Sequence, residues 1–326
     1  MGNELEFLLQ SNQAPVRYRA MRDILSERPE APEMQALQQQ IRFSPIVQGL
    51  LSERNAEGEL PHHPYAKWVG AHWVLACLAD LAYPPADRDL FPLLESVYNW
   101  LLSNHHLRSI KTINERVRRC ASQEGNALYY SLVLGISDDR SQQIAERLLS
   151  WQWPDGGWNC DKRPEAKNSS FMESLIPMRA LALYAQESGD PTVAQAAERA
   201  AEIFLKRELF KRQQDGSIIS EDFLLLHYPC YWHYDVLFAL KVMAEAGFID
   251  DPRCKAGLDW LEAKRLPRGG FPLEKKYYRT APKAKTGRSL VAWDTTRRRR
   301  SGKEPNEFVT ADALYVLRSA GRLAVQ

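Results

Sequence analysis

The sequence contains no run of about 18 consecutive apolar residues, the length that a membrane-spanning helix requires. Strict alternation of apolar and polar residues, the pattern of a half-buried strand, is almost absent as well. We therefore expect a protein without a membrane span and without a substantial sheet. Peripheral contact with a membrane stays open.

The chain also lacks an excess of charge of one sign. Its 43 lysine and arginine residues nearly balance its 41 aspartate and glutamate residues, which leaves a net charge of +2. A nucleic-acid-binding surface usually carries a marked basic excess, so we expect no nucleic-acid partner.

Paired cysteines are missing too. The five cysteines (Cys77, Cys120, Cys160, Cys230 and Cys254) are odd in number and include no C-x-x-C pair. The first residues show neither the basic segment nor the apolar segment of a secretory signal. Together these features predict a reduced, cytoplasmic protein.

Helical periodicity, by contrast, recurs along most of the chain. Apolar helices are predicted at Pro64–Leu81, Glu124–Leu134, Phe171–Ala185, Tyr231–Ala246 and Thr310–Ala320. More charged helices are predicted between them, at Asp89–Leu102, Gln142–Trp151, Ala194–Leu209 and Pro252–Ala263. This alternation indicates an all-α fold of helical hairpins, with an apolar inner layer and a charged outer layer.

A glycine-rich turn follows several of the charged helices. Residues 152–158 read Gln-Trp-Pro-Asp-Gly-Gly-Trp, and residues 213–218 and 266–271 repeat the pattern loosely. A hairpin that cannot bury its own apolar face must stack on its neighbours. After the first turn, Ser170 and Glu173 have the spacing of a capping box for the helix that begins at Phe171.

The run from Gln152 to Trp158 resembles the Q-x-x-D-G-x-W repeat of squalene and oxidosqualene cyclases. The Gly-Gly-aromatic turns are similar to those of protein prenyltransferase β subunits. The resemblance implies an (α/α) toroid of the terpenoid cyclase type over residues 61–326, with residues 1–60 capping or closing it. In those cyclases the Gln and Trp link adjacent outer helices, so we expect Gln152, Trp151 and Trp158 to be structural.

The same resemblance implies an enzyme that holds an isoprenoid or other apolar substrate in an aromatic-lined central cavity, with acid or metal-assisted chemistry. The Asp-x-Asp-Asp acid of class II terpene cyclases does not occur in the sequence, which argues against protonation-initiated cyclisation of squalene. The candidate substrate contacts are Trp68, His72, Trp73, Tyr129, Phe171, Tyr231 and Trp232. Core packing is the alternative explanation for these aromatic residues.

The metal pattern of the prenyltransferases is Asp-x-Cys with a distant His. Its nearest counterpart here is Cys160 and Asp161 with His233. Thiolate, carboxylate and imidazole are ligands that zinc accepts, so we predict that these three converge at the cavity mouth and bind Zn²⁺. In the structural alternative, Cys160 is buried and His233 is bonded to backbone.

The candidate catalytic residues are Asp235, His233 and Asp312. Asp235 lies in an aromatic segment, where an aspartate must be paired or carry a raised pKa suited to acid catalysis. An arginine such as Arg163 or Arg179 is the expected partner in the first case. For Asp312, helix capping is the alternative.

Residues 275–307 form a long connection without regular periodicity, which predicts either a flap over the cavity or a disordered segment. Within it, Arg297–Arg300 have the charge to bind a diphosphate or an acidic partner.

Two other classes of function remain open from the sequence. One is a non-catalytic toroid that binds a lipid, glycan or protein, and the other is a sugar-processing toroid enzyme. The cavity lining separates the classes, since aromatic walls with one acid or metal favour isoprenoid chemistry and a polar centre favours binding. Convergent carboxylates favour sugar cleavage. The oligomeric state is not predicted.

Overall fold

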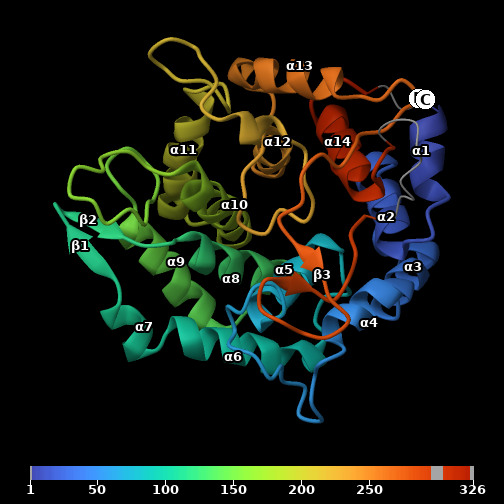
Figure 1. Cartoon of the computed structure of the whole chain (residues 1–326), viewed down its shortest axis with the longest axis horizontal. Helices are drawn as coiled ribbons and strands as arrows, with labels where there is room; N and C mark the ends of the chain where they lie inside the picture. The colour runs from blue at the N-terminus through green and yellow to red at the C-terminus, as the bar shows by residue number, and fades with distance from the viewer. Residues whose placement is uncertain (1, 295–303, 324–326) are drawn as a thin grey trace.

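Helices with an apolar face dominate a computed structural model that describes residues 2–294 and 304–323 (Figure 1). One set of helices, which we call the apolar helices because each buries an apolar face, consists of α2 (Ala14–Arg19) with the π-helical turn η1 (Ala20–Ile24), α5 (Ala71–Asp80), α8 (Ser122–Val133), α10 (Phe171–Ser188), α12 (Val236–Glu245) and α14 (Glu307–Ser319). The others are α1 (Gly2–Leu9), α3 (Pro32–Arg42), α4 (Pro45–Leu51), α6 (Phe91–Leu101), α7 (Asn104–Arg108), α9 (Asp139–Trp151), α11 (Pro191–Leu205) and α13 (Lys255–Ala263). The all-α prediction is therefore confirmed.

The strands are short and local. β1 (Lys111–Ile113) pairs antiparallel with β2 (Arg116–Arg118), and β3 (Arg279–Thr280) pairs parallel with β4 (Arg288–Ser289). No sheet in the described part of the chain has more than two strands.

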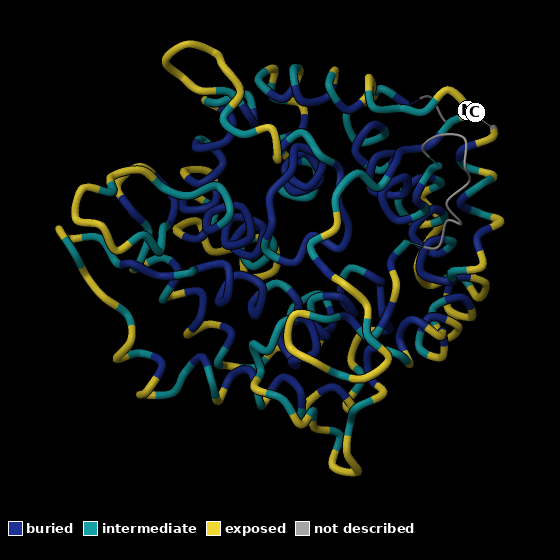
Figure 2. The backbone as a smooth tube through the Cα atoms, viewed as in Figure 1, coloured by how far each residue is buried: buried dark blue, intermediate teal, exposed yellow. Residues whose placement is uncertain are grey.

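The apolar helices pack in chain order. α5 contacts α8, α8 contacts α10, α10 contacts α12, α12 contacts α14, and α14 contacts α2 and η1. In Figure 1 these helices lie inside the molecule, while α3, α6, α9, α11 and α13 lie at its periphery. Figure 2 shows the same division as a buried interior and more exposed outer turns. The two classes of helix thus differ in position, but the prediction that the outer helices are the more charged is wrong for α6, a peripheral helix with a single charged residue, Glu95.

Gln152 links two peripheral helices, as the repeat motif predicts. Gln152 follows the last residue of α9, and its side-chain amide donates to the carbonyl of Ala196 in α11 at 2.8 Å and accepts from Arg199. Gly156 lies in the same turn with a φ of +103°, which favours glycine, and its α-carbon faces the Arg199 carbonyl closely. Trp158 is buried and donates to the Leu148 carbonyl at 3.0 Å.

Two predicted helix starts are wrong. The helix predicted from Pro64 begins at Ala71, and the helix predicted from Tyr231 begins at Val236, after an irregular segment in which Tyr231 has a positive φ. The reason in the second case is Asp235, which accepts from the Phe238 backbone N–H at 2.7 Å and so caps the helix rather than lying within it.

The predicted capping box at α10 is also wrong. Ser170 makes no side-chain capping bond, and Glu173 accepts instead from the Ser122 backbone N–H at the start of α8.

The described part of the 275–307 connection packs on the segment before α5. Gly287 N–H donates to the Lys67 carbonyl, Trp68 N–H approaches the Arg288 carbonyl at 3.4 Å, and Trp293 is fully buried. The predicted anion-binding run Arg297–Arg300 lies outside the described residues. Among the helices of residues 2–294 and 304–323, none is both long and apolar enough to cross a membrane.

Candidate functional site

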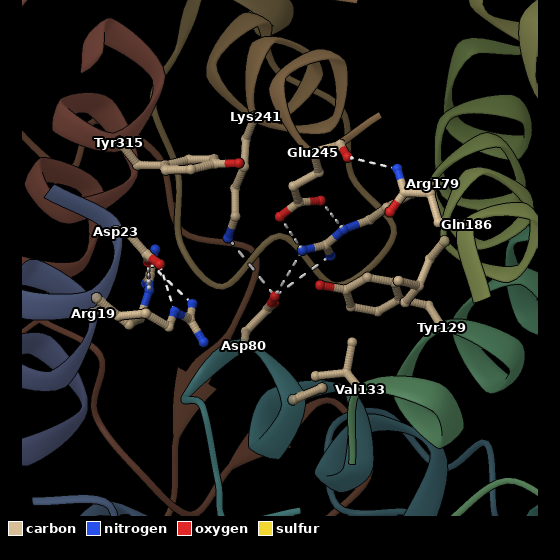
Figure 3. Close-up of a pocket in the computed structure, with 13 residues that line it drawn as sticks. Arg19, Asp23, Asp80, Tyr129, Val133, Arg179, Gln186, Lys241, Glu245 and Tyr315 are labelled. Carbon is tan, nitrogen blue, oxygen red and sulfur yellow. Dashed lines mark hydrogen bonds and ion pairs between the residues drawn. The ribbon is translucent and has the colours of Figure 1, made fainter. Parts of the chain in front are cut away.

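A pocket of about 320 Å³ opens where the C-terminal parts of the apolar helices meet (Figure 3). Each of α2 with η1, α5, α8, α10, α12 and α14 contributes to its wall. The lining residues are Arg19, Arg22, Asp23, Ala79, Asp80, Tyr129, Val133, Arg179, Leu183, Gln186, Lys241, Glu245 and Tyr315. We call this the central pocket.

Arg179 joins two carboxylates across the central pocket. Its Nε lies 2.6 Å from Glu245 Oε2, and its Nη2 lies 3.4 Å from Asp80 Oδ1. The guanidinium carbon lies 3.7 Å from the centre of the Tyr129 ring, in a cation–π contact. Because the side chain is only 5% exposed, these partners hold it in one position (Figure 3).

A second buried group of charges lies beside the first. Asp312 accepts from Lys241 at 2.8 Å and also from Arg19. Asp23, which is partly exposed, lies 3.8 Å from Arg19, whereas Arg19, Lys241 and Asp312 are buried. Nη1 of Arg19 is buried and has no hydrogen-bond partner among the described residues, so one donor of this group is unused.

The shifts of the pKa values in this group keep Lys241 protonated and Asp312 ionised. Burial alone would lower the pKa of Lys241 and raise that of Asp312, but their mutual attraction, with Arg19 and Asp80, outweighs burial. The pKa of Lys241 is therefore raised and the pKa of Asp312 lowered. An ionised Asp312 is suited to pairing and not to proton donation.

A smaller cavity of about 10 Å³ lies next to the central pocket and shares Asp80, Tyr129 and Arg179 with it. Cys77, Tyr231 and Phe238 are among its other walls. A space of this size holds about one water molecule, so the central pocket does not extend into a long internal tunnel here.

Most of the predicted substrate-contacting aromatics pack against one another. Trp68 stacks on Tyr231 with ring centres 3.9 Å apart, and Trp73 meets Trp68 edge-on at 4.9 Å. His72 is completely buried, and burial lowers its pKa to about 3. Tyr129 is the member of the predicted set that lines the central pocket, while Tyr231 lines only the small cavity.

The remaining two predicted aromatics also lie in clusters. Phe171 stacks with Phe223 at 5.4 Å and contacts Tyr234 edge-on. Trp232 stacks on His233 at 4.1 Å, and the Lys67 ammonium lies 4.9 Å from its ring.

Two predicted catalytic residues lie away from the central pocket. Asp235 accepts from the His227 backbone N–H at 3.0 Å, and its Oδ2 lies 2.6 Å from His227 Nδ1, so neither Arg163 nor Arg179 is its partner. His233 stacks on Tyr277, and burial lowers its pKa to about 3.

Asp312 does not cap its helix. Asn306 caps α14 by accepting from the Phe308 and Val309 N–H groups, and Asp312 lies one turn further on.

The structure separates the predicted zinc ligands. Asp161 is tied to Arg163, whose Nη2 lies 2.5 Å from its carboxylate. Among the described residues, the group of three whose ligand atoms lie within 4.8 Å of one another consists of Cys120, Cys160 and Glu173, and it includes neither Asp161 nor His233.

The charged residues of the central pocket were not predicted from the sequence. Arg179 and Lys241 each interrupt a predominantly apolar helix, and Asp80 and Glu245 are the last residues of α5 and α12. A charged residue on a buried helix must find a partner or solvent, so this interruption was the available signal.

The chain matches no protein-family model and no curated protein. It is similar to the solved structure of the type II terpene cyclase MstE from Scytonema, with a TM-score of 0.27, 16% identity, and coverage of 85% of this chain and 97% of that one. A variant of that cyclase in complex with geranylgeranyl dihydroxybenzoate gives a TM-score of 0.26, 16% identity, and coverage of 85% and 96%. TM-scores this low do not establish a shared fold, so function is inferred below from this chain's own residues.

Proposed function

We propose that the protein is a terpenoid cyclase-like (α/α) toroid that binds a small amphiphilic molecule in the central pocket. In this proposal residues 61–326 supply five inner helices, and α2 with η1, from residues 1–60, closes the ring against α14. The observation that carries the proposal is the pocket wall, to which six neighbouring helices contribute at the same end. Parallel inner helices arranged around one axis produce such a wall.

The wall combines fixed polar groups with apolar surface. The Arg179, Asp80 and Glu245 group offers donors and acceptors to the polar head of a ligand. Tyr129, Val133 and Leu183 offer contact to an apolar body. Pockets of roughly 300–1,000 Å³ with this mixture are typical small-molecule sites.

The charges of the pocket favour an uncharged head over a diphosphate. Acidic side chains pair with the basic ones described above, so no strong excess of positive charge remains. The helices also present their C-terminal ends here, where free carbonyls carry negative partial charge. We therefore expect a prenyl alcohol to bind better than the matching prenyl diphosphate.

Native mass spectrometry and calorimetry with farnesol, farnesyl diphosphate and maltotriose test this proposal on the full chain. Val133→Trp should fill the pocket without removing a charged group and weaken farnesol binding at least about tenfold, since a ligand cannot share the space. The matched control is Ile218→Trp, at a surface position 38% exposed. Binding that Val133→Trp leaves unchanged, or no binding of any of the three, would overturn the proposal. Preference for maltotriose would favour the sugar-processing alternative.

An enzyme that acts on the same class of molecule is the second candidate. The carboxylates of Asp23, Asp80 and Glu245 at the central pocket favour it, since each is a conceivable acid or base once a ligand displaces its basic partner. Incubation of farnesol with the wild-type protein, followed by mass spectrometry of the products, distinguishes turnover from binding alone.

A further inference from the structure

A second cluster of reactive side chains lies at the opposite ends of the helices from the central pocket. Cys120 precedes α8, Cys160 lies in the link before α10, and Glu173 lies in the first turn of α10. Their ligand atoms are all within 4.8 Å of one another. All five cysteines of the chain are free, so neither thiol is used in a disulfide.

We propose that Cys120, Cys160 and Glu173 bind a zinc ion, with its fourth position open to water. The ligand set is one that zinc accepts, because two thiolates and a carboxylate are all common zinc ligands. Three protein ligands with an open position are the arrangement of zinc sites that react with a bound molecule, rather than of closed structural sites.

The spacing fits a tetrahedral ion. Zn–S bonds of about 2.3 Å and Zn–O bonds of about 2.1 Å place sulfur and oxygen about 3.6 Å apart. The observed separation of Cys160 Sγ from Glu173 Oε1 is 3.7 Å. The other carboxylate oxygen, Oε2, accepts from the Ser122 backbone N–H at 3.1 Å, which orients Oε1 toward the thiols.

Glu173 provides an independent reason to expect a cation. Its side chain is 9% exposed, and no basic side chain lies within ion-pair distance of it in the described part of the chain. Its carboxylate oxygens accept from the Ser122 backbone N–H and from the Cys160 thiol, and neither partner carries a positive charge. A divalent cation would supply an opposite charge at this buried carboxylate.

The position of the cysteines also favours a metal ion, since both lie close to the start of α10, within 4.8 Å of a carboxylate oxygen of Glu173. Cys120 also lies two residues before the start of α8, and the positive end of a helix dipole favours negative charge at such a position. Both cysteines are only half-buried, which leaves a path for the ion.

The test is the zinc content of full-length protein that is purified in reductant and without chelator. We expect one zinc ion per chain in the wild type and in the control Cys254→Ala, whose thiol is fully buried elsewhere. Cys120→Ser and Cys160→Ser should lose the zinc, and Glu173→Gln should weaken zinc affinity at least about tenfold, since even outer-shell changes cost that much. Melting curves verify that each variant is folded.

Cobalt titration of the reduced wild type gives a readout that does not depend on variants. Cobalt bound by these residues should show thiolate-to-metal charge transfer and the strong visible bands of a tetrahedral site. Absence of these bands together with absence of zinc, or zinc content that neither cysteine substitution lowers, would overturn the proposal. Farnesol binding in the same samples reports on the central pocket separately, so failure of one proposal does not imply failure of the other.

Discussion

Lys241 of α12 and Asp312 of α14 form an ion pair of 2.8 Å in which both side chains are almost fully buried. Arg19 of α2 binds the same carboxylate. Asp312 is nearer to both buried cations than Asp23 and Asp80, which lie 3.8 Å from Arg19 and Lys241, respectively. The stability of the helix interior therefore depends strongly on Asp312.

Substitution of Asp312 by Ala should lower the free energy of unfolding by about 3–5 kcal/mol, because Lys241 and Arg19 would remain buried with less compensation. Urea denaturation followed by circular dichroism measures this change. The control is Asp259→Ala, which removes surface ion pairs with Lys255 and Arg322 and should change stability little. Equal effects of the two substitutions would contradict the prediction.

Gln152→Ala should lower the free energy of unfolding by about 1–2 kcal/mol, since it removes the bonds that join the end of α9 to α11. Gln142→Ala is a matched control, because among the described residues the side chain of Gln142 bonds only to Glu146, within α9. If the melting temperature falls as far in Gln142→Ala as in Gln152→Ala, the bonds between α9 and α11 are not the cause of the lost stability.

Two glycine substitutions separate backbone strain from steric clash. A β-carbon at Gly156 would lie 2.3 Å from the Arg199 carbonyl oxygen, whereas one at Gly216 would meet nothing within 4 Å. Both positions have positive φ, so Gly216→Ala should cost about 1–2 kcal/mol. Gly156→Ala should cost about 1–3 kcal/mol more in the same denaturation experiment, because of the added clash. Similar costs would show that α11 moves to accommodate the methyl group.

The protein should lose stability as the pH falls from about 6.5 toward 5. Burial lowers the pKa of His72 from 6.5 to about 3, so the unfolded chain binds a proton in this range that the folded chain does not. That difference is present at every pH between the two values and favours unfolding increasingly as the pH falls. His72→Gln should flatten the dependence of melting temperature on pH, whereas His105→Gln, at an exposed position, should not. An unchanged slope in His72→Gln would rule out His72 as the cause.

The sequence predicted the helices well because their apolar periodicity is a local property. The prediction failed at the start of α12. The aromatic residues before this helix pack around Trp68, but their spacing is also that of an apolar helix. Periodicity also does not reveal that Asp235 caps the helix. The signal that distinguishes an N-cap from an interior aspartate is the backbone conformation before it, which periodicity does not reveal.

The candidate sites were harder to predict because they depend on long-range contacts. Cys160 was selected from its place after a glycine turn, but its neighbours Cys120 and Glu173 follow from how two helix starts approach each other. The central pocket depends in the same way on charges from six helices. A single sequence shows which apolar helices carry a charge but not which charges meet.

The contact between Arg19 and Asp312 spans 293 positions of the chain, which has a consequence for synthesis on the ribosome. At the usual 5–20 residues per second, Arg19 is made roughly 15–60 seconds before its partner. During that interval the guanidinium group of Arg19 cannot be buried against Asp312, so we expect the first helices to stay hydrated and incompletely packed. We therefore expect the nascent chain to be a substrate for chaperones until α14 emerges.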